Sequence, residues 1–530
     1  MPMRSPYPDV DVPDVSLTEF LFGADVGNHA GATALVDGTT GDAMTFGRLH
    51  AAVEDVAAGL HARGVRTGDV IGLVGSNSPR WVLAFHAALR ANATVTTCNP
   101  LYTTGELANQ FTDSGAGFVI TDGKSREKVV EAAAKAGLGA DSVFTLDAAD
   151  GHTGLEELAA AGGEAPTPAV GAEDTAVLPY SSGTTGRAKG VVLTHRNLVA
   201  NVLQFDRMVT STRGSAQLAV LPLFHIYGMT VLMNHSLRTR APLITMPRFD
   251  LAEMLRLVDE HRVRKLYVAP PTVLALAKDP LVASYDLSSL EMVFSGAAPL
   301  DGELGGALTD RLGCAVLQGY GMTEMSPVSH AIPEDRLDLD PASCGFGLPG
   351  IEYRLVDPAT GEEVGPGERG ELRVRGPNVM SGYLNNAEAT AQTLDEDGYL
   401  RTGDVATATA EGVITIVDRV KELIKYKGYQ VPPAELEAVL LTHPAIDDAA
   451  VIGVRDAGGE EVPKAFVVRS GGSALTADDV ITHVADRIAP HKKVRAVEFV
   501  DAIPKSASGK ILRNKLREAE LSEVPHPASR

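Results

Sequence analysis

Residues 180–190 of this 530-residue chain read YSSGTTGRAKG, and this glycine-rich stretch decides how the sequence around it is interpreted. It follows a strand-like run at 176–178 and precedes another at 191–193. The glycines let the backbone turn tightly and aim successive N–H groups at one point. Two serines, two threonines and Lys189 add hydroxyl donors and a positive charge. The stretch therefore predicts a cradle for a polyphosphate.

The spacing of this loop differs from that of a Walker-type phosphate loop, which requires GxxxxGK[ST]. Here Gly183 is followed by Gly186, and Lys189 is followed by a glycine. The loop also leads into a strand rather than a helix, so no helix dipole contributes to phosphate binding. A flexible polar hairpin is the alternative, but the order SSGTTGxxKG, followed by Thr194 and His195, favours a nucleotide loop.

Upstream of this loop, short β-like runs alternate with runs of helical period. Thr45 is a predicted N-cap, and Gly64 is the predicted end of the first helix. The pattern further predicts strands at 70–74, 93–98, 118–121 and 143–146 and helices at 80–90 and 125–136. A βαβα order is typical of parallel sheets covered by helices, so the expected fold class is α/β with several domains.

Downstream of residue 351 the pattern changes. Short strands at 352–356, 370–374 and 413–417 are separated by Gly, Pro and Asp turns, which predicts a β-rich lobe. A basic run follows Asp418, and a helix is predicted at 476–488 with Thr476 as its cap. We therefore place an N-terminal domain at 1–418, a hinge at 419–421 and a C-terminal domain at 422–530.

Composition and charge exclude several classes of protein. The chain has 47 Lys and Arg against 68 Asp and Glu, a formal charge of −21, which disfavours binding to nucleic acid or an anionic membrane. Its three cysteines form no CxxC pair, which argues against a zinc site or a disulfide framework. The longest apolar run, 219–233, is too short to span a membrane, and no secretory signal pattern is seen. We expect a cytoplasmic protein.

Five motifs follow one another along the chain: 180–190, 318–324 (QGYGMTE), 399–404 (YLRTGD), 418–430 (DRVKELIKYKGYQ) and 504–513 (PKSASGKILR). With them the chain resembles the adenylate-forming superfamily of acyl-CoA synthetases, adenylation domains and luciferases. Residues 222–228, 295–300 and 421–430 are most similar to 4-coumarate:CoA ligases. The resemblance implies a large N-terminal domain of two α/β layers plus a β-barrel-like lobe, and a small mobile α+β C-terminal domain.

The resemblance also implies a two-step reaction that uses ATP, Mg²⁺ and CoA. A carboxylate is a poor acyl donor, and its attack on the α-phosphate of ATP gives an acyl-adenylate and pyrophosphate. A thiolate then displaces AMP. The first step requires two anions to be neutralised and held in line. Lys510 is expected to bridge the acid carboxylate and the nucleotide, and the alternative is a solvated lysine of the C-terminal tail.

The same motifs assign further residues to the nucleotide and the metal. Thr323 is expected at the α-phosphate, Glu324 at Mg²⁺, and Asp404 at both ribose hydroxyls with Arg419 in support. His225 is expected between the nucleotide and the acyl pocket rather than as a core residue. The set expected to bind ATP or AMP is Ser181, Ser182, Gly183, Thr184, Thr185, Gly186, Lys189, Gln318, Gly319, Tyr320, Thr323, Asp404, Arg419, Lys421, Lys425, Gln430 and Lys510.

The basic run after Asp418 is implied to serve both steps. Lys421 matches the hinge position, where a few residues absorb the change of a domain rotation. The small domain is expected to present Lys510 for adenylation and then its other face, with Lys425, for thioester formation. The residues expected to bind CoA are Arg248, Lys427 and Gly428, and those assigned to catalysis are Lys510, His225, Thr323 and Lys425. The alternative for the lysines is a basic surface strip.

The acyl pocket implied by the resemblance suits an aromatic acid. Tyr227 can stack on a ring or bond a phenol, and small residues leave a flat slot, which favours a hydroxycinnamate such as 4-coumarate. Val231 stands where plant enzymes frequently have serine, which makes this side of the pocket less polar, so a medium-chain or aryl-alkanoic acid also fits. Ala188 replaces the usual proline of the glycine-rich loop, which is expected to loosen the turn slightly without removing a donor to phosphate. The expected lining is Tyr227, Val231, Ser295, Gly296, Ala297, Gly319, Met322, Pro327 and Val328.

Two other functions compete with an acid:CoA ligase. The activated acid could pass to a carrier protein or to an unusual nucleophile such as an amine, although Arg248, Lys427 and Gly428 favour free CoA. The chain could also be a nucleotide-binding regulator without catalysis, but the presence of Lys510, Glu324 and Asp404 argues against that function.

Overall fold

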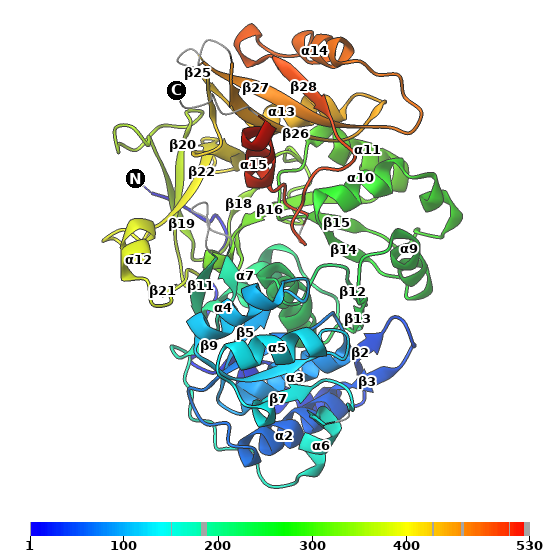
Figure 1. The fold of residues 1–530 in the computed structure, drawn as a ribbon, viewed down its shortest axis with the longest axis vertical. Helices are drawn as coiled ribbons and strands as arrows, with labels where there is room; N and C mark the ends of the chain where they lie inside the picture. The colour runs from blue at the N-terminus through cyan, green and yellow to red at the C-terminus, as the bar shows by residue number, and fades with distance from the viewer. Residues whose placement is uncertain are drawn as a thin grey trace, which may run out of the picture.

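The computed structural model describes residues 2–149, 151–181, 188–426, 429–456, 460–507 and 509–523. Figure 1 shows the N-terminal helices, in blue and cyan, at one end of the molecule and the C-terminal strands and helices, in orange and red, at the other. The architecture has α/β layers, a β-rich lobe and a small C-terminal domain, as the sequence predicts.

The first layer is a sheet of nine strands, counted within the described residues, in the order β10-β11-β9-β5-β4-β6-β7-β8, with β21 paired to β11. At its centre β4 runs parallel to both β5 and β6, which confirms the predicted parallel sheet. The strands are β4 (Val70–Val74), β5 (Thr94–Cys98), β6 (Ala116–Thr121), β7 (Val143–Thr145), β8 (Thr153–Gly154), β9 (Thr175–Val177), β10 (Tyr180–Ser181), β11 (Lys189–Thr194) and β21 (Gly382–Tyr383).

Three helices of this layer, α2, α3 and α5, begin and end close to the predicted positions, and two more, α4 and α6, were not predicted. The Thr45 hydroxyl accepts a hydrogen bond from the Arg48 N–H at 3.3 Å, which confirms Thr45 as the N-cap of the first long helix. The helices are α2 (Phe46–Ala62), α3 (Pro79–Arg90), α4 (Thr104–Ser114), α5 (Arg126–Lys135) and α6 (Leu155–Ala160).

The second layer combines two smaller sheets. One has the order β12-β13-β2-β3, and the other has the order β14-β15-β16-β17-β18, parallel up to β16 and antiparallel beyond it. The strands are β2 (Thr33–Asp37), β3 (Ala43–Thr45), β12 (Gln217–Ala219), β13 (Leu243–Thr245), β14 (Lys265–Val268), β15 (Met292–Ser295), β16 (Ala315–Gly321), β17 (Val328–Ala331) and β18 (Phe346–Gly347). The helices are α7 (His195–Met208), α8 (His235–Thr239), α9 (Leu251–Glu260), α10 (Pro270–Lys278) and α11 (Gly302–Leu312).

A π-helix, η3 (Gly228–Asn234), lies in the apolar run 219–233, and the sequence pattern did not predict it. All of its residues are buried. A Cβ at Gly228 would lie 2.2 Å from the Pro222 carbonyl oxygen, so only glycine allows the chain to pass there. π-Helical turns are rare and are frequent at functional sites.

The β-rich lobe is an antiparallel sheet in the order β1-β19-β20-β22-β23. Its strands confirm the three predicted ones and add two. They are β1 (Met3–Arg4), β19 (Glu352–Val356), β20 (Gly370–Arg375), β22 (Leu400–Ala408) and β23 (Ile414–Arg419). Arg419 is the last residue of β23, so the turn that leads to the C-terminal elements starts at Val420.

The C-terminal elements have their own apolar cores, one around Val451 and another around Phe466. Thr476 and Asp479 form a capping box, as predicted, but the helix that follows ends at Ala485, three residues before the predicted end. The elements are β24 (Ile424–Tyr426), β25 (Tyr429–Val431), α13 (Pro433–Leu441), β26 (Ile446–Arg455), β27 (Glu461–Arg469), α14 (Ala477–Ala485), β28 (Ala496–Phe499) and α15 (Arg513–Glu523).

Short helices complete the described chain. They are α1 (Leu17–Phe22), η1 (Ala24–His29), η2 (Ala140–Ser142), η4 (Pro280–Ser284), η5 (Thr323–Met325), α12 (Ala387–Thr393) and η6 (Pro490–Lys492). Among the residues that the structure describes, no helix combines the length and the apolar character that a membrane crossing needs.

Candidate active site

The ends of the glycine-rich loop are held by a hairpin. Ser181 pairs with Lys189 across β10 and β11. The Ser181 hydroxyl donates to Glu324 Oε1 at 2.9 Å, which connects the loop to η5. Lys189 Nζ lies 4.9 Å from the centre of the Tyr383 ring. Ser182, Gly183, Thr184, Thr185 and Gly186, which the sequence assigns to the phosphates, lie outside the described residues.

Glu324 is a buried carboxylate with two hydroxyl donors on one oxygen. The residue is 4% exposed, and Tyr383 donates to the same Oε1 at 2.8 Å. Both bonds end on Oε1, so Oε2 is the oxygen suited to a cation. Thr323, which precedes it in η5, is half-buried. Tyr383 reaches this place because β21 pairs with β11, and the sequence motifs gave no indication of it.

A second cluster joins Asp404, Arg419 and Tyr320. Asp404 and Arg419 face each other across β22 and β23, and Arg419 Nε lies 3.0 Å from Asp404 Oδ1. The Tyr320 hydroxyl donates to Asp404 Oδ2 at 2.5 Å. Burial and the neighbouring Asp404 carboxylate raise the pKa of Tyr320 well above its ordinary value, so the phenol remains a donor. The fold thus joins residues from separate motifs, since Tyr320 and Asp404 lie 84 positions apart in the chain.

Lys510 lies in this cluster. Burial, together with the positive charge of Arg419, lowers the pKa of its ammonium to about 8, while Asp404 acts in the opposite direction. Its loop is a tight turn in which the Ser506 N–H donates to the Lys510 carbonyl at 2.8 Å. The loop rests on α10, because a Cβ at Gly509 would lie 3.3 Å from the Ala269 Cβ. The C-terminal domain therefore faces the second layer with Lys510 inward.

His225 lies within electrostatic range of Lys510. Its pKa is lowered to about 4 by burial and by the charge of Lys510, so the imidazole is neutral at physiological pH. The Tyr227 N–H donates to His225 Nδ1 at 3.3 Å. This bond assigns the ring proton to Nε2, which leaves an N–H donor for a substrate.

The expected acyl pocket is built around two aromatic rings that rest on glycines. A Cβ at Gly296 would lie 2.9 Å from the Tyr227 ring, and a Cβ at Gly319 would lie 2.5 Å from the Phe294 ring. The two glycines have no side chain, so the aromatic rings can pack directly against them, in addition to the space expected for a substrate. The Tyr227 hydroxyl donates to the Phe294 and Val268 carbonyls at 3.4 and 3.5 Å. Val231 is buried one turn along η3.

The opposite wall comes from the β16–β17 turn. The Met322 N–H donates to the Pro327 carbonyl at 3.0 Å, and Gly321 pairs with Val328. Ala297 has a φ of 71°, an unusual value for a residue with a Cβ. The Ser295 hydroxyl is buried and has no hydrogen-bond partner among the described residues. The predicted lining thus comes from three places: Tyr227 and Val231 at the start of η3, residues 295–297 at the end of β15, and Gly319, Met322, Pro327 and Val328 in or between β16 and β17.

Gln318 departs from its expected role. Its Oε1 accepts from the Leu300 N–H at 2.6 Å, and its Nε2 donates to the Pro341 carbonyl at 3.0 Å. The side chain is 1% exposed. Because both ends of the amide bond backbone groups, the Gln318 side chain holds the loops beside β16.

Several other predicted residues are exposed or lie outside the described residues. Arg248 is exposed on the connection between β13 and α9, and Lys421 is exposed in the turn after β23. Lys425 is exposed on β24, where its N–H donates to Glu461 at 2.9 Å. Lys427 and Gly428 lie outside the described residues, and of Gln430 only the backbone in β25 is described.

Comparison with known proteins places this geometry in context. Residues 22–384 match the AMP-binding enzyme family, and residues 435–510 match the AMP-binding enzyme C-terminal domain. The 4-coumarate–CoA ligase 3 of Oryza sativa subsp. japonica is 41% identical over 98% of this chain and 95% of its own. ATP-bound MatB from Rhodopseudomonas palustris superposes with a TM-score of 0.88 at 32% identity, over 96% of this chain and 99% of its own. The anthranilate CoA ligase AuaEII with anthranoyl-AMP has a TM-score of 0.89 at 25% identity, over 96% of this chain and 98% of its own.

Proposed function

This chain belongs to the AMP-binding enzyme family and is an AMP-forming acid–CoA ligase, and we propose that it activates a hydroxycinnamate of the 4-coumarate type. The observation that carries the proposed mechanism is the position of Lys510, inward beside Asp404 and Arg419 and close enough to His225 to lower its pKa. A lysine in that position can stand between a carboxylate and a nucleotide.

In the adenylation step, the acid carboxylate attacks the α-phosphate of ATP, the bond to the pyrophosphate breaks, and an acyl-adenylate forms. The repulsion between the two anions is the largest barrier to their reaction. Protonated Lys510 offsets their charge as they approach. His225 Nε2–H donates to the acid carboxylate, and Asp404 accepts from the ribose hydroxyls while Arg419 and Tyr320 hold its orientation. Thr323 binds an α-phosphate oxygen.

Mg²⁺ fits the site at Glu324. The carboxylate is buried, and Ser181 and Tyr383 both donate to Oε1, so Oε2 is the oxygen left for the ion. One protein carboxylate beside phosphate oxygens and water is a usual arrangement for this ion. Bound there, Mg²⁺ would neutralise phosphate charge.

The second step requires the C-terminal domain to turn. We propose a body of residues 1–418, a hinge at 419–421 and a mobile domain of residues 422–530. After adenylation the Lys510 loop leaves, and the face that carries Lys425 replaces it. The CoA thiolate then attacks the adenylate carbonyl and AMP leaves. Arg248, Lys427 and Gly428 are the proposed contacts of CoA.

The choice of acid rests on two buried hydroxyls near the expected pocket lining. The Tyr267 ring lies 6.0 Å from the Phe294 ring, and its buried hydroxyl has no hydrogen-bond partner among the described residues. The Thr230 hydroxyl of η3 is likewise buried without a partner there. A buried unpaired hydroxyl is costly, so each favours a substrate that carries its own polar group at the far end. A phenol meets that requirement, and an unbranched aliphatic chain does not.

Free CoA is the proposed acceptor. The relative that matches nearly the whole chain is named a CoA ligase, which favours CoA over a carrier protein or an amine. Cys98, Cys314 and Cys344 are all buried free thiols, which is consistent with the proposed cytoplasmic location.

An acid panel tests the proposal. Pyrophosphate release and thioester formation are measured with 4-coumarate, cinnamate, 3-phenylpropanoate and octanoate, each with and without CoA. We expect 4-coumarate to have the highest kcat/KM and its thioester to form only with CoA. A preference for octanoate, or product formed with a carrier protein but not with CoA, contradicts the proposal.

A further inference from the structure

Asp404 is held in place by a β-bulge. In the β20–β22 pair, Glu371 faces Val405 and Arg373 faces Arg401, so residues 402–404 all lie opposite Leu372. Bulges re-aim side chains and leave backbone groups without their ladder partners. Here the extra residues turn the Asp404 carboxylate toward Tyr320 and Arg419. The geometry of the bulge therefore sets the position of the ribose-binding carboxylate.

Glu371 supplies the partner that the bulge needs. The Gly403 N–H donates to Glu371 Oε1 at 3.3 Å, and Gly403 has a φ of 70°. The Thr402 hydroxyl donates to the Leu372 carbonyl at 2.7 Å and accepts from the Asp404 N–H at 3.1 Å. On its other side, the Gly403 carbonyl accepts from the Val420 N–H at 2.9 Å. One glycine thus links Glu371 to the turn that begins the hinge.

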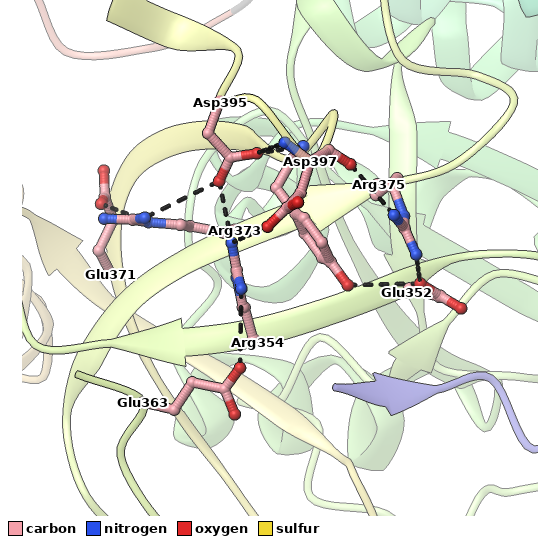
Figure 2. A network of polar contacts seen from close by, with 9 residues as sticks. Glu352, Arg354, Glu363, Glu371, Arg373, Arg375, Asp395 and Asp397 are labelled. Carbon is pink, nitrogen blue, oxygen red and sulfur yellow. Dashed lines mark hydrogen bonds and ion pairs between the residues drawn. The ribbon is translucent and has the colours of Figure 1, made fainter. Parts of the chain in front are cut away.

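The Glu371 carboxylate is itself fixed by charged neighbours. Arg373 Nε bonds Glu371 Oε2 at 3.2 Å, and the two side chains are only 16% and 14% exposed. Arg373 also lies 3.9 Å from Asp395, which bonds Arg354 at 2.9 Å. Figure 2 shows this row of alternating charges, with Asp395 between Arg354 and Arg373 and Glu371 at the end of the row. Each charge limits the freedom of the next.

We infer that Glu371 is a positioning residue for Asp404. By holding the Gly403 N–H, its carboxylate fixes the bulge that aims Asp404 at the ribose hydroxyls, and Arg373 holds Glu371 in the orientation that this bond requires. The inference rests on the proposed function, because it takes Asp404 as the ribose-binding residue. Glu371 contacts neither substrate nor metal, and it acts on nucleotide selection through the backbone.

The test is the ratio of kcat/KM for ATP to that for 2′-deoxy-ATP, measured as pyrophosphate release. This ratio reports the bond to the 2′-hydroxyl and does not change when the fraction of folded enzyme falls. We expect Glu371→Ala to lower the ratio about tenfold, the value of one hydrogen bond to a charged group. The KM for the acid is expected to stay unchanged. Glu371→Met, which fills the same volume without an acceptor, is judged by the same criterion if the alanine variant does not fold.

Two further variants separate positioning from stability. Glu371→Gln keeps an acceptor for Gly403 but loses the ion pair with Arg373, so we expect the ratio to stay within about threefold of wild type while the melting temperature falls. Glu363→Gln removes the charge of a carboxylate that is 42% exposed and lies 3.7 Å from Arg354 in the same row of charges. We expect no change in the ratio for this variant.

Asp404→Ala distinguishes failure of the inference from failure of the proposed function. If Asp404→Ala retains the wild-type ratio, the proposed ribose contact is wrong and the inference falls with it. If the ratio falls in Asp404→Ala but stays at the wild-type value in Glu371→Ala and Glu371→Met, only the role of Glu371 is overturned.

Discussion

At the scale of single residues, Lys510 couples the chemistry to pH. Its pKa of about 8 means that the ammonium is mostly protonated at pH 7 and loses its proton within reach of ordinary assays. Only the protonated form offsets the charge of carboxylate and phosphate. Because the charged form is the active one, activity is present below the pKa and lost above it. Bound ATP favours the ammonium, so the free enzyme shows the effect most clearly.

A pH profile of adenylation checks this assignment. The kcat/KM for ATP is expected to be flat up to about pH 8 and then to fall tenfold per pH unit. Lys510→Arg keeps its charge throughout the range, so its activity is expected to be lower but free of this decline. A decline at the same pH in the arginine variant shows that another group titrates.

Glu324 gives a prediction about Mg²⁺. Glu324→Gln keeps an acceptor for Ser181 and Tyr383 but removes the charge on the oxygen proposed for the metal. The Mg²⁺ concentration for half-maximal adenylation is expected to rise at least tenfold, and saturating Mg²⁺ is expected to restore part of the rate. Glu362→Gln, at an exposed glutamate in the loop between β19 and β20, is the control. An unchanged Mg²⁺ requirement in Glu324→Gln rejects the assignment.

Site residues that lie in sequence motifs could be predicted, whereas those that reach the site through strand pairing could not. Asp404, Arg419 and Lys510 lie in motifs, and the structure brings these three together. Tyr383 and Glu371 reach the site only through strand pairing between distant segments, which no local pattern reveals. Gln318 lies in a motif, yet its side chain holds loops, because a motif does not say which atoms face the ligand.

At the scale of elements, the strands and caps of the first layer follow from local pattern. Thr45 and Thr476 cap helices as expected, since a cap depends on neighbouring residues. The π-helix η3 does not follow, because the same apolar run suits an α-helix and tertiary packing selects between them. The glycine–aromatic contacts of the pocket are equally invisible in sequence, since Phe294 and Gly319 lie on different strands.

Gly319→Ala tests the packing of the pocket. Its Cβ would lie 2.5 Å from Phe294 and 3.1 Å from the His330 carbonyl, so the ring must move. We expect a loss of about 1–3 kcal/mol in stability and a higher KM for the acid with little change in the KM for ATP. Gly117→Ala, at a strand glycine with open space around its Cβ, is the matched control for thermal unfolding. Equal melting temperatures for the two variants contradict the packing described for Gly319.

At the scale of the whole molecule, the net charge is −21, and only a few lysine and arginine side chains serve the site in this acidic chain. Lys189 lies over the ring of Tyr383, which bonds Glu324, while Arg419 and Lys510 lie together beside Asp404. This arrangement requires the C-terminal domain to rest on the N-terminal one. The Lys278 ammonium also bonds the Leu441 carbonyl at 3.2 Å across that boundary. In this orientation Lys510 lies inward, as the proposed adenylation step requires.

Gly509→Val tests whether this orientation serves only one step. A side chain at Gly509 meets Ala269 and Pro271, so valine is expected to hinder closure and to slow adenylation at least tenfold. Thioester formation from supplied acyl-AMP is expected to change little. Gly472→Val shares the positive φ, +78° against +83°, but has open space, and it controls for backbone strain. Equal loss in both half-reactions for Gly509→Val contradicts a step-specific role of this contact.

The most direct test of the proposed mechanism is Lys510→Ala assayed in two half-reactions. ATP–pyrophosphate exchange with 4-coumarate is expected to fall at least a hundredfold, because the charge that stabilises the adenylation transition state is gone. Thioester formation from supplied coumaroyl-AMP and CoA is expected to stay within a few-fold of wild type, since the second step uses the other face of the C-terminal domain. Undiminished exchange, or an equal fall in both half-reactions, contradicts the central role of Lys510 in adenylation.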